Sequence, residues 1–299
     1  VIRTECDQVG AKLVCVGDNS DDGKSRDRDK LLSSGKDGLN FPRGFRVEKE
    51  NMRTALLALK VLGFNRPNFR GFFWPCRMEF FELQSGPCDD DRGETSDLTV
   101  VVDGAHNVAS LKLFLAGLSA LVGPQRPVWV LFGACKDKAV GEMIGALLTG
   151  VQAILFAQSG NFRGEKEACL VELAEEEKRK QRRKSYDDKN KNKNSKGATR
   201  RESLESARLL NHQLATLDTL PPGVPHSPSG EENGGSSVFP RMAALLALCA
   251  DAARISPDGT PVVAVCGSLF VAAEAREFIY YKNPELFDED DWVHARDTA

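Results

Sequence analysis

The stretch VVDGAHNVAS, residues 101–110, runs two valines directly into Asp103 and Gly104, and then places His106 and Asn107 before an apolar helical pattern. A near-continuous apolar run is typical of a strand that helices cover on both faces. The polar residues therefore follow the carboxyl end of a buried strand and precede a helix. In open parallel α/β sheets, ligands bind at this place.

The same alternation of strand and helix patterns recurs along the chain. Strands are predicted at 98–102, 127–132, 151–157 and 260–266, and helical patterns at 108–122, 139–150, 241–254 and 271–281. Strands that alternate with helices of this length indicate parallel pairing through helical crossovers. We therefore predict an α/β fold, with a mostly parallel Rossmann-like sheet flanked by helices.

Composition restricts the classes of protein. The chain has 299 residues, 41% of them hydrophobic, and a formal net charge of -3. Its apolar runs are shorter than the roughly 18 residues of a membrane-spanning helix. Eight cysteines without a C-x-x-C pair favour reduced, buried thiols over disulfides or zinc. We expect a cytoplasmic monomer with no membrane partner, or a mitochondrial protein in a eukaryote.

Two segments are predicted along the chain. The run VEKENMRTALLALKVLGF, residues 47–64, has an apolar helical face that Gly63 ends, and a Pro- and Gly-containing stretch follows it. We place the boundary between 1–66 and 67–299. Since the chain begins with Val1 rather than Met, we expect it to be a fragment of a longer protein.

Residues 177–237 interrupt the α/β pattern. They combine the charged run EEKRKQRRKSYDDKNKNKNSK with a Pro/Gly/Ser-rich run, and neither can bury enough apolar surface to offset its ordering entropy. We predict a disordered, solvent-exposed insert. KRKQRRK could alternatively follow the phosphates of a nucleic acid. It has no interleaved aromatic residues and it has acidic neighbours, so we expect no nucleic-acid partner.

Polar side chains follow three of the predicted strands. Asp103 to Asn107, Lys136 to Lys138, and Gly267 with Ser268 each come after a strand's carboxyl end. Each group has a structural explanation by itself, as a turn, a helix cap or an exposed charge cluster. Because the carboxyl ends of parallel strands share one edge of a sheet, their coincidence predicts a site there.

Four stretches carry a family resemblance. FFWPCRMEF (72–80), VVDGAHN (101–107), LFGACKDKAV (131–140) and VVAVCGSLFVAAEARE (262–277) resemble, in this order, the carboxyl-terminal half of folylpolyglutamate synthase and dihydrofolate synthase. These are Mur-ligase-type enzymes. The resemblance implies a Mur ligase C-terminal domain at 67–299, preceded at 1–66 by the tail of a truncated central ATP-binding domain.

The resemblance also implies roles for individual residues. It implies that Asn51, Arg77 and Asp103 contact ATP. It also implies that His106 and Lys138 are active-site residues with a catalytic role, and that Ser268 binds substrate. Two positions depart from the family pattern. Cys76 stands where Gly usually precedes Arg77, and Ala139 replaces the second Asp of D-K-D.

The implied reaction is ATP-dependent amide formation. A folate or dihydropteroate carboxylate is activated as an acyl phosphate, and the amine of L-glutamate displaces the phosphate, with Mg²⁺ neutralising the nucleotide charge. We expect this chain alone to be inactive, because the phosphate-binding loop of such ligases belongs to an amino-terminal part. A muramyl-type ligase and a non-catalytic nucleotide-binding scaffold remain alternatives.

Overall fold

The computed structural model describes the chain in parts, which are most of 51–63, and 74–84, 97–123, 126–192, 208–210, 236–255 and 260–287. The chain divides into two compact units, Val1–Phe73 and Trp74–Ala299. Each is described by itself. This division lies seven residues after the predicted boundary at 66/67, and the assignment of the two segments to particular domains stays a prediction.

The described part of the first unit is helical within residues 51–61. Asn51 is exposed on this segment. Leu62 N–H donates to the carbonyl of Ala58 at 3.0 Å, and Gly63 follows with a φ of 91°. A left-handed glycine is a common end to a helix because it has no Cβ to clash with the preceding turn. Gly63 therefore has the helix-ending conformation that the sequence predicted.

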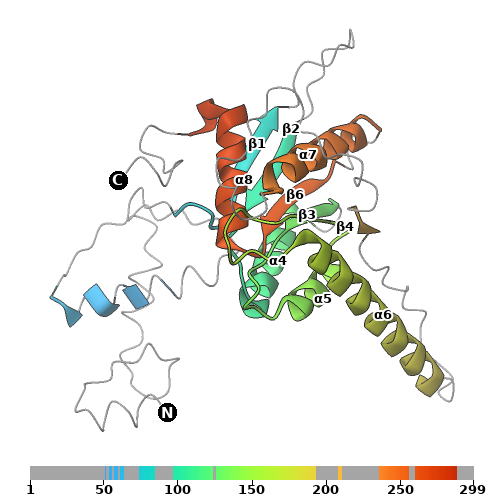
Figure 1. The fold of residues 1–299 in the computed structure, drawn as a ribbon. Coiled ribbons are helices and arrows are strands. Elements are labelled where there is room, and N and C mark those ends of the chain that lie inside the picture. The colour runs from blue at the N-terminus through green and yellow to red at the C-terminus, as the bar shows by residue number, and fades with distance from the viewer. Residues whose placement is uncertain are drawn as a thin grey trace. The chain divides into compact units, whose positions relative to one another are not determined.

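The second unit is built on one six-stranded sheet (Figure 1). The order of the strands is β1 (Glu79–Gln84), β2 (Asp97–Val102), β6 (Val262–Cys266), β3 (Val128–Phe132), β4 (Ala153–Phe156) and β5 (Arg208–Leu209). β1 pairs antiparallel with β2, and every other pairing is parallel. The predicted mostly parallel α/β fold is confirmed.

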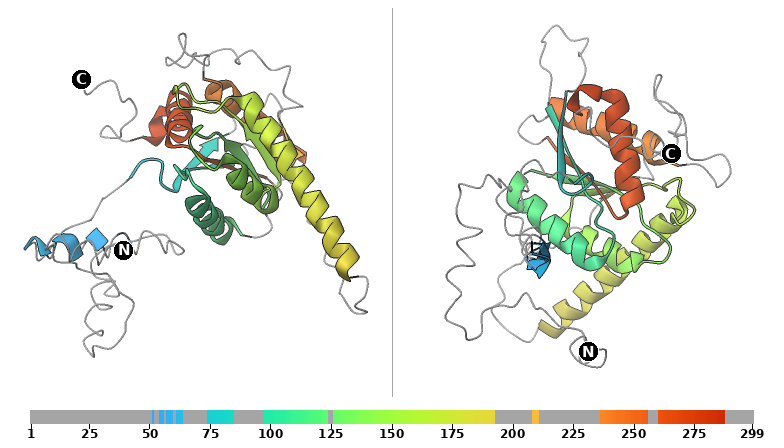
Figure 2. Two further views of the ribbon diagram at one scale, coloured as in Figure 1. Left: turned by 60° about the horizontal axis from the view of Figure 1, so that its bottom comes forward. Right: turned by 90° about the vertical axis from the view of Figure 1, so that its left-hand side faces the viewer.

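Helices cover both faces of this sheet (Figure 2). α4 (Val108–Val122), α5 (Val140–Gly150) and α6 (Glu167–Asn192) pack on one face, and α7 (Val238–Ile255) and α8 (Leu269–Lys282) on the other. A 3-10 turn, η2 (Pro284–Leu286), follows α8. Val101 faces the first layer while Val100 and Val102 face the second, as the two-residue period of a strand requires. Burial on both faces explains the unbroken valine run.

Helix α6 corrects part of the predicted insert. Irregular structure was expected from about residue 177, but the helix continues to Asn192. Glu176 and Glu177 both pair with Lys180, at 3.0 and 2.8 Å, and acidic residues fill the first half of the helix while basic residues follow. That order of charges complements the helix dipole, and Glu, Lys, Arg and Gln are good helix formers. Residues 193–207 and 211–235 lie outside the described residues.

A buried ion pair joins β1 to α8. Arg276 Nε lies 2.8 Å from Glu79 Oε1, both side chains are almost fully buried, and the guanidinium carbon sits 4.8 Å from the ring centroid of Phe287. The other oxygen of the carboxylate, Oε2, accepts the backbone N–H of Cys76 at 2.9 Å. Glu79 therefore anchors the edge strand and also the turn that precedes it.

None of the helices in the described part of the chain combines the length and apolar character needed to cross a bilayer. The described cysteines are free thiols at 76, 135, 169, 249 and 266, as the sequence predicted for them. Burial raises the pKa of Cys249 to about 12, which keeps this core thiol protonated.

Arg276→Met should lower the free energy of unfolding by about 3–5 kcal/mol, because it leaves the Glu79 carboxylate buried without its cation. Adding Glu79→Leu should recover part of that loss, since two buried charges are then gone. Urea denaturation measures both effects, and Lys282→Met, on the exposed part of the same helix, is the control. An Arg276→Met protein as stable as the control would contradict this assignment.

Candidate functional site

The carboxyl ends of the three central strands are bound to one another. β2, β6 and β3 are neighbours, and the backbone N–H of Asp103 donates to the carbonyl of Val265 at 2.9 Å. In return, the N–H of Gly267 donates to Ala105 at 2.8 Å. The predicted common edge for Asp103 and Ser268 is therefore confirmed. Lys138 lies in the loop that follows β3, the third strand of this set.

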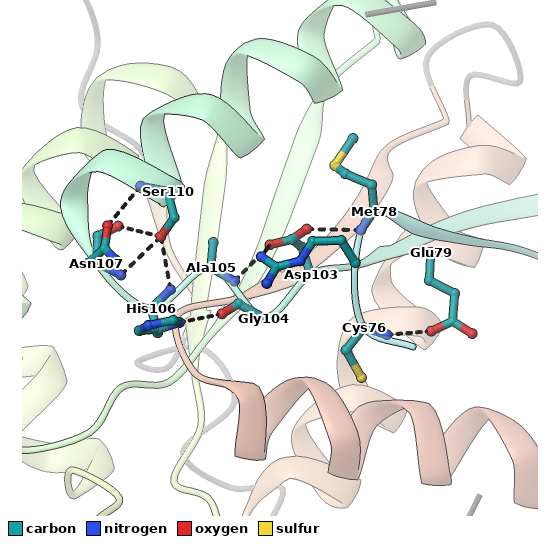
Figure 3. Close-up of polar contacts among 10 residues, drawn as sticks. Cys76, Met78, Glu79, Asp103, Gly104, Ala105, His106, Asn107 and Ser110 are labelled. Atoms are coloured by element: carbon teal, nitrogen blue, oxygen red, sulfur yellow. Dashed lines mark hydrogen bonds and ion pairs between the residues drawn. The ribbon is translucent and has the colours of Figure 1, made fainter. Parts of the chain in front are cut away.

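Asp103 is a buried carboxylate with two backbone donors (Figure 3). Its Oδ1 accepts the N–H of Ala105 at 2.7 Å, and its Oδ2 accepts the N–H of Met78 at 2.9 Å. Burial raises the pKa of Asp103, and the N–H of Met78, the charge of Arg77 and the N–H of Ala105 oppose that rise. The charge of this carboxylate therefore depends on the donors that surround it.

The turn that contains Arg77 is held from several sides. Cys76 and Met78 both have left-handed backbone conformations, with φ of 55° and 46°. The carbonyl of Cys76 accepts the N–H of Gly104 at 2.7 Å, while Asp103 binds the N–H of Met78. Asp103 and Gly104, both in the loop after β2, thus hold the turn by hydrogen bonds on either side of Arg77.

The side chain of Arg77 is not clamped in the same way. It is 48% exposed, and its Nη1 lies 4.0 Å from Oδ1 of Asp103. A planar guanidinium with several free donor positions suits the oxygens of an anionic ligand. The arrangement combines a fixed backbone with an accessible cation.

His106 presents one ring nitrogen outward. Its Nδ1 lies 2.9 Å from the carbonyl oxygen of Gly104, and because a carbonyl only accepts, Nδ1 carries the proton. In the neutral ring, Nε2 of this exposed residue is then an acceptor. The cap of α4 is Asn107, whose Oδ1 accepts the N–H of Ser110 at 2.8 Å. The alternative that His106 merely caps this helix is therefore wrong.

Ser268 has a structural place at the start of α8. It is buried, and its hydroxyl oxygen accepts the N–H of Phe270 at 3.2 Å and lies 3.7 Å from the sulfur of Cys135. The preceding Gly267 has a φ of 104°, and a Cβ there would come within 2.4 Å of the carbonyl oxygen of Gly133. This close approach of two strand ends requires glycine.

A cluster of charges follows β3 and β4. Asp137 Oδ2 lies 3.1 Å from Lys138 Nζ and 3.0 Å from Arg163 Nη2, and hydrogen bonds from Lys138 and then Arg163 hold the pKa of Asp137 below its usual value. Lys136 Nζ donates to the carbonyl of Phe162 at 3.2 Å. Sequence reasoning missed Arg163, although it too follows the carboxyl end of a strand.

The described residues do not form a site for Mg²⁺ by themselves. In the parts of the chain that the structure describes, three or more His, Cys, Asp or Glu side chains do not gather at any point where they could hold a metal ion. Asn51 belongs to the first unit, and its position relative to these loops is not described. The cationic side chains at the sheet edge are of the type that binds phosphate or carboxylate.

Residues 90–201 match the family of the Mur ligase, glutamate ligase domain. Similar solved structures include Mycobacterium tuberculosis folylpolyglutamate synthase complexed with ADP, with 18% identity, a TM-score of 0.45, and coverage of 82% of this chain and 41% of that one. Another is Escherichia coli FolC in complex with DHPP and ADP, with 17% identity, a TM-score of 0.42, and coverage of 78% and 39%. No curated protein matches the sequence.

This chain thus spans about two fifths of the length of those two proteins. The residues that match this family model include Asp103, His106 and Lys138. The match confirms the resemblance to Mur-ligase-type enzymes that the sequence motifs indicated. The roles of the individual residues are not tested by it.

Asp103→Asn should lower the free energy of unfolding by about 1–3 kcal/mol, because an amide NH₂ would replace one of two oxygens that each accept a backbone N–H. Asp137→Asn is the matched control, since that carboxylate is exposed, and it should stay within about 0.5 kcal/mol of wild type. Equal stabilities in urea denaturation would contradict the clamping role of Asp103.

Cys76→Gly should be at least as stable as Cys76→Ala, the reverse of the usual order, because Cys76 has a φ of 55°. Alanine keeps the Cβ that is unfavourable in the left-handed region, whereas glycine removes a cost of about 1 kcal/mol. Both variants lose the buried thiol, so the comparison isolates the backbone. Thermal melting with the alanine variant clearly more stable would show that the turn is not left-handed in solution.

Proposed function

We propose that this chain, whose residues 90–201 match the family of the Mur ligase, glutamate ligase domain, is part of an ATP-dependent ligase that joins L-glutamate to a folate or dihydropteroate carboxylate. The observation that carries the proposal is the clamped turn of Arg77 at the sheet edge where Asp103 and His106 also lie. The family match supplies the class of reaction, and the site supplies groups suited to anionic substrates.

Arg77 is the residue that we assign to nucleotide contact. ATP, when bound, supplies the phosphoryl group that activates the acceptor carboxylate. The guanidinium is half exposed, permanently charged, and carried by a turn whose two flanking residues are hydrogen-bonded to the loop after β2. A turn held in this way loses little backbone freedom on binding, so more of the interaction energy of its cation contributes to affinity.

Asp103 acts through Arg77 in this proposal. Its side chain is almost fully buried, and each of its oxygens already accepts a backbone N–H. It is therefore a positioning residue, which holds the Arg77 turn against the end of β2. Ser268 has a similar part, because its buried hydroxyl caps α8 and so fixes the loop after β6.

The remaining exposed groups suit the amino-acid substrate. Lys138 and Arg163 both pair with the carboxylate of Asp137, and the ammonium of Lys136 contacts the carbonyl of Phe162 beside Arg163, which leaves positive charge for a carboxylate of glutamate. The outward Nε2 of His106 can accept a hydrogen bond from a substrate N–H or O–H. Mg²⁺, when bound with ATP, would neutralise nucleotide charge, and the described residues do not supply a site for it by themselves.

Arg77→Gln should raise the KM for ATP about ten- to a hundred-fold, the equivalent of losing one hydrogen bond to a charged group. Its melting temperature should stay close to wild type, because the side chain is half exposed. The assay is ATP-dependent transfer of labelled glutamate by the protein expressed from its complete coding sequence. Arg208→Gln, an exposed arginine on β5, is the control and should not change KM.

A panel of acceptors separates this proposal from its alternatives. Transfer to dihydropteroate or tetrahydrofolate supports it, whereas transfer only to a muramyl acceptor supports a muramyl-type ligase. ATP binding without transfer to any acceptor would indicate a nucleotide-binding scaffold. Unchanged ATP kinetics in Arg77→Gln would remove Arg77 from the site.

A further inference from the structure

The distal half of α6 extends away from the sheet (Figures 1 and 2). On the inner face of the helix, Leu170 and Ala174 are buried and Gln181 Nε2 donates to the carbonyl of Gly145 on α5 at 3.0 Å. These three residues follow the three-to-four-residue spacing of one helical face. That contact anchors the helix, and the opposite face is free to meet another molecule.

Three arginines and a tyrosine occupy that opposite face. Arg179, Arg182, Arg183 and Tyr186 are spaced as i, i+3, i+4 and i+7, so they lie along one stripe, which we call the arginine–tyrosine stripe. All four side chains are exposed, Tyr186 by 67%. None of the three arginines forms an ion pair with an acidic side chain in the described part of the chain.

The charge of this region differs sharply from that of the whole chain. Residues 178–201 contain twelve Lys or Arg and two Asp, a net charge of +10, although the complete chain has a net charge of -3. Such a local excess of positive charge attracts a polyanion and makes its binding dependent on salt. By helical position Asp188 falls on the side of Lys184, whereas Asp187 comes one turn after Arg183, at the edge of the stripe.

We propose that the arginine–tyrosine stripe of α6 binds single-stranded nucleic acid. Arginine forks pair with phosphate oxygens, and an aromatic ring among them offers a surface on which an unpaired base stacks. Because phosphate contacts and stacking do not depend on the identity of the base, the stripe should accept any sequence, and RNA and DNA alike. The sequence alone had suggested no such partner, because only the helix brings Tyr186 onto the arginine face.

An anionic membrane is the rival polyanion, and the stripe fits it less well. A helix that lies in a bilayer interface needs an apolar face opposite its basic one. On α6 the apolar residues, Leu170 and Ala174 among them, are buried against the domain, and the distal part has Tyr186 as its exposed large hydrophobic residue. Membrane binding would rest on charge alone and would not need the tyrosine.

Fluorescence anisotropy of the 299-residue chain tests the proposal, with labelled strands of oligouridine and oligothymidine of about 20 nucleotides, longer than typical binding sites. Substituting Arg179, Arg182 and Arg183 together by Gln should weaken binding at least ten-fold. It should also reduce the slope of log K against log salt by about 2, since each phosphate contact on a single strand contributes about 0.7. Tyr186→Ala should weaken binding about ten-fold and leave the slope unchanged, because stacking releases no counterions.

A triple variant with the same loss of charge elsewhere, Lys112→Gln, Lys166→Gln and Lys282→Gln, is the matched control, since those lysines are exposed on other elements. It should retain most of the affinity. Equal losses in the two triple variants, or no binding by wild type at physiological salt, would overturn the proposal. So would tighter binding to phosphatidylserine vesicles that Tyr186→Ala leaves intact. The stripe shares no residue with the sheet-edge site, so glutamate transfer should be unaffected by these variants.

Discussion

The carboxylate of Asp103 lies between two backbone N–H groups, those of Met78 and Ala105, and the rest of the site depends on these two hydrogen bonds. One of them shapes the loop after β2, and the other holds a turn that comes 25 residues earlier in the chain. An acceptor with two oxygens can bind both donors at once. The same contacts set the position of Arg77, whose side chain remains accessible.

Burial separates the polar residues of the site into two groups. Asp103 and Ser268 are buried and hydrogen-bonded to backbone, so their chemistry is used to hold loops in place. Arg77 and His106 are accessible, so their chemistry is available to a ligand. The exposed charges around Asp137 belong to the second group. A ligand would therefore meet a cationic surface that a buried polar layer supports.

Sequence reasoning predicted the sheet and its edge because those features follow local patterns. Runs such as the valines before Asp103 indicate doubly covered strands, and the direction of parallel strands brings their ends together. It missed the Glu79–Arg276 pair, whose partners are 197 residues apart and have no common pattern. It also mistook the first part of the charged insert for irregular structure, because i to i+3 and i to i+4 ion pairs, rather than an apolar face, stabilise the middle of α6, where that insert was expected to begin. The roles proposed for Asp103 and Ser268 depend on how exposed their side chains are, and residue type alone does not reveal that exposure.

The most direct measurement is a crystal structure of the protein, expressed from its complete coding sequence, with a non-hydrolysable ATP analogue. The account predicts that the guanidinium of Arg77 lies within hydrogen-bonding distance of a nucleotide oxygen, at the carboxyl ends of β2 and β6. It also predicts that Asp103 keeps the N–H groups of Met78 and Ala105 and makes no direct contact with the nucleotide. A nucleotide bound away from this edge, or one held by Asp103 with Arg77 turned outward, would contradict it.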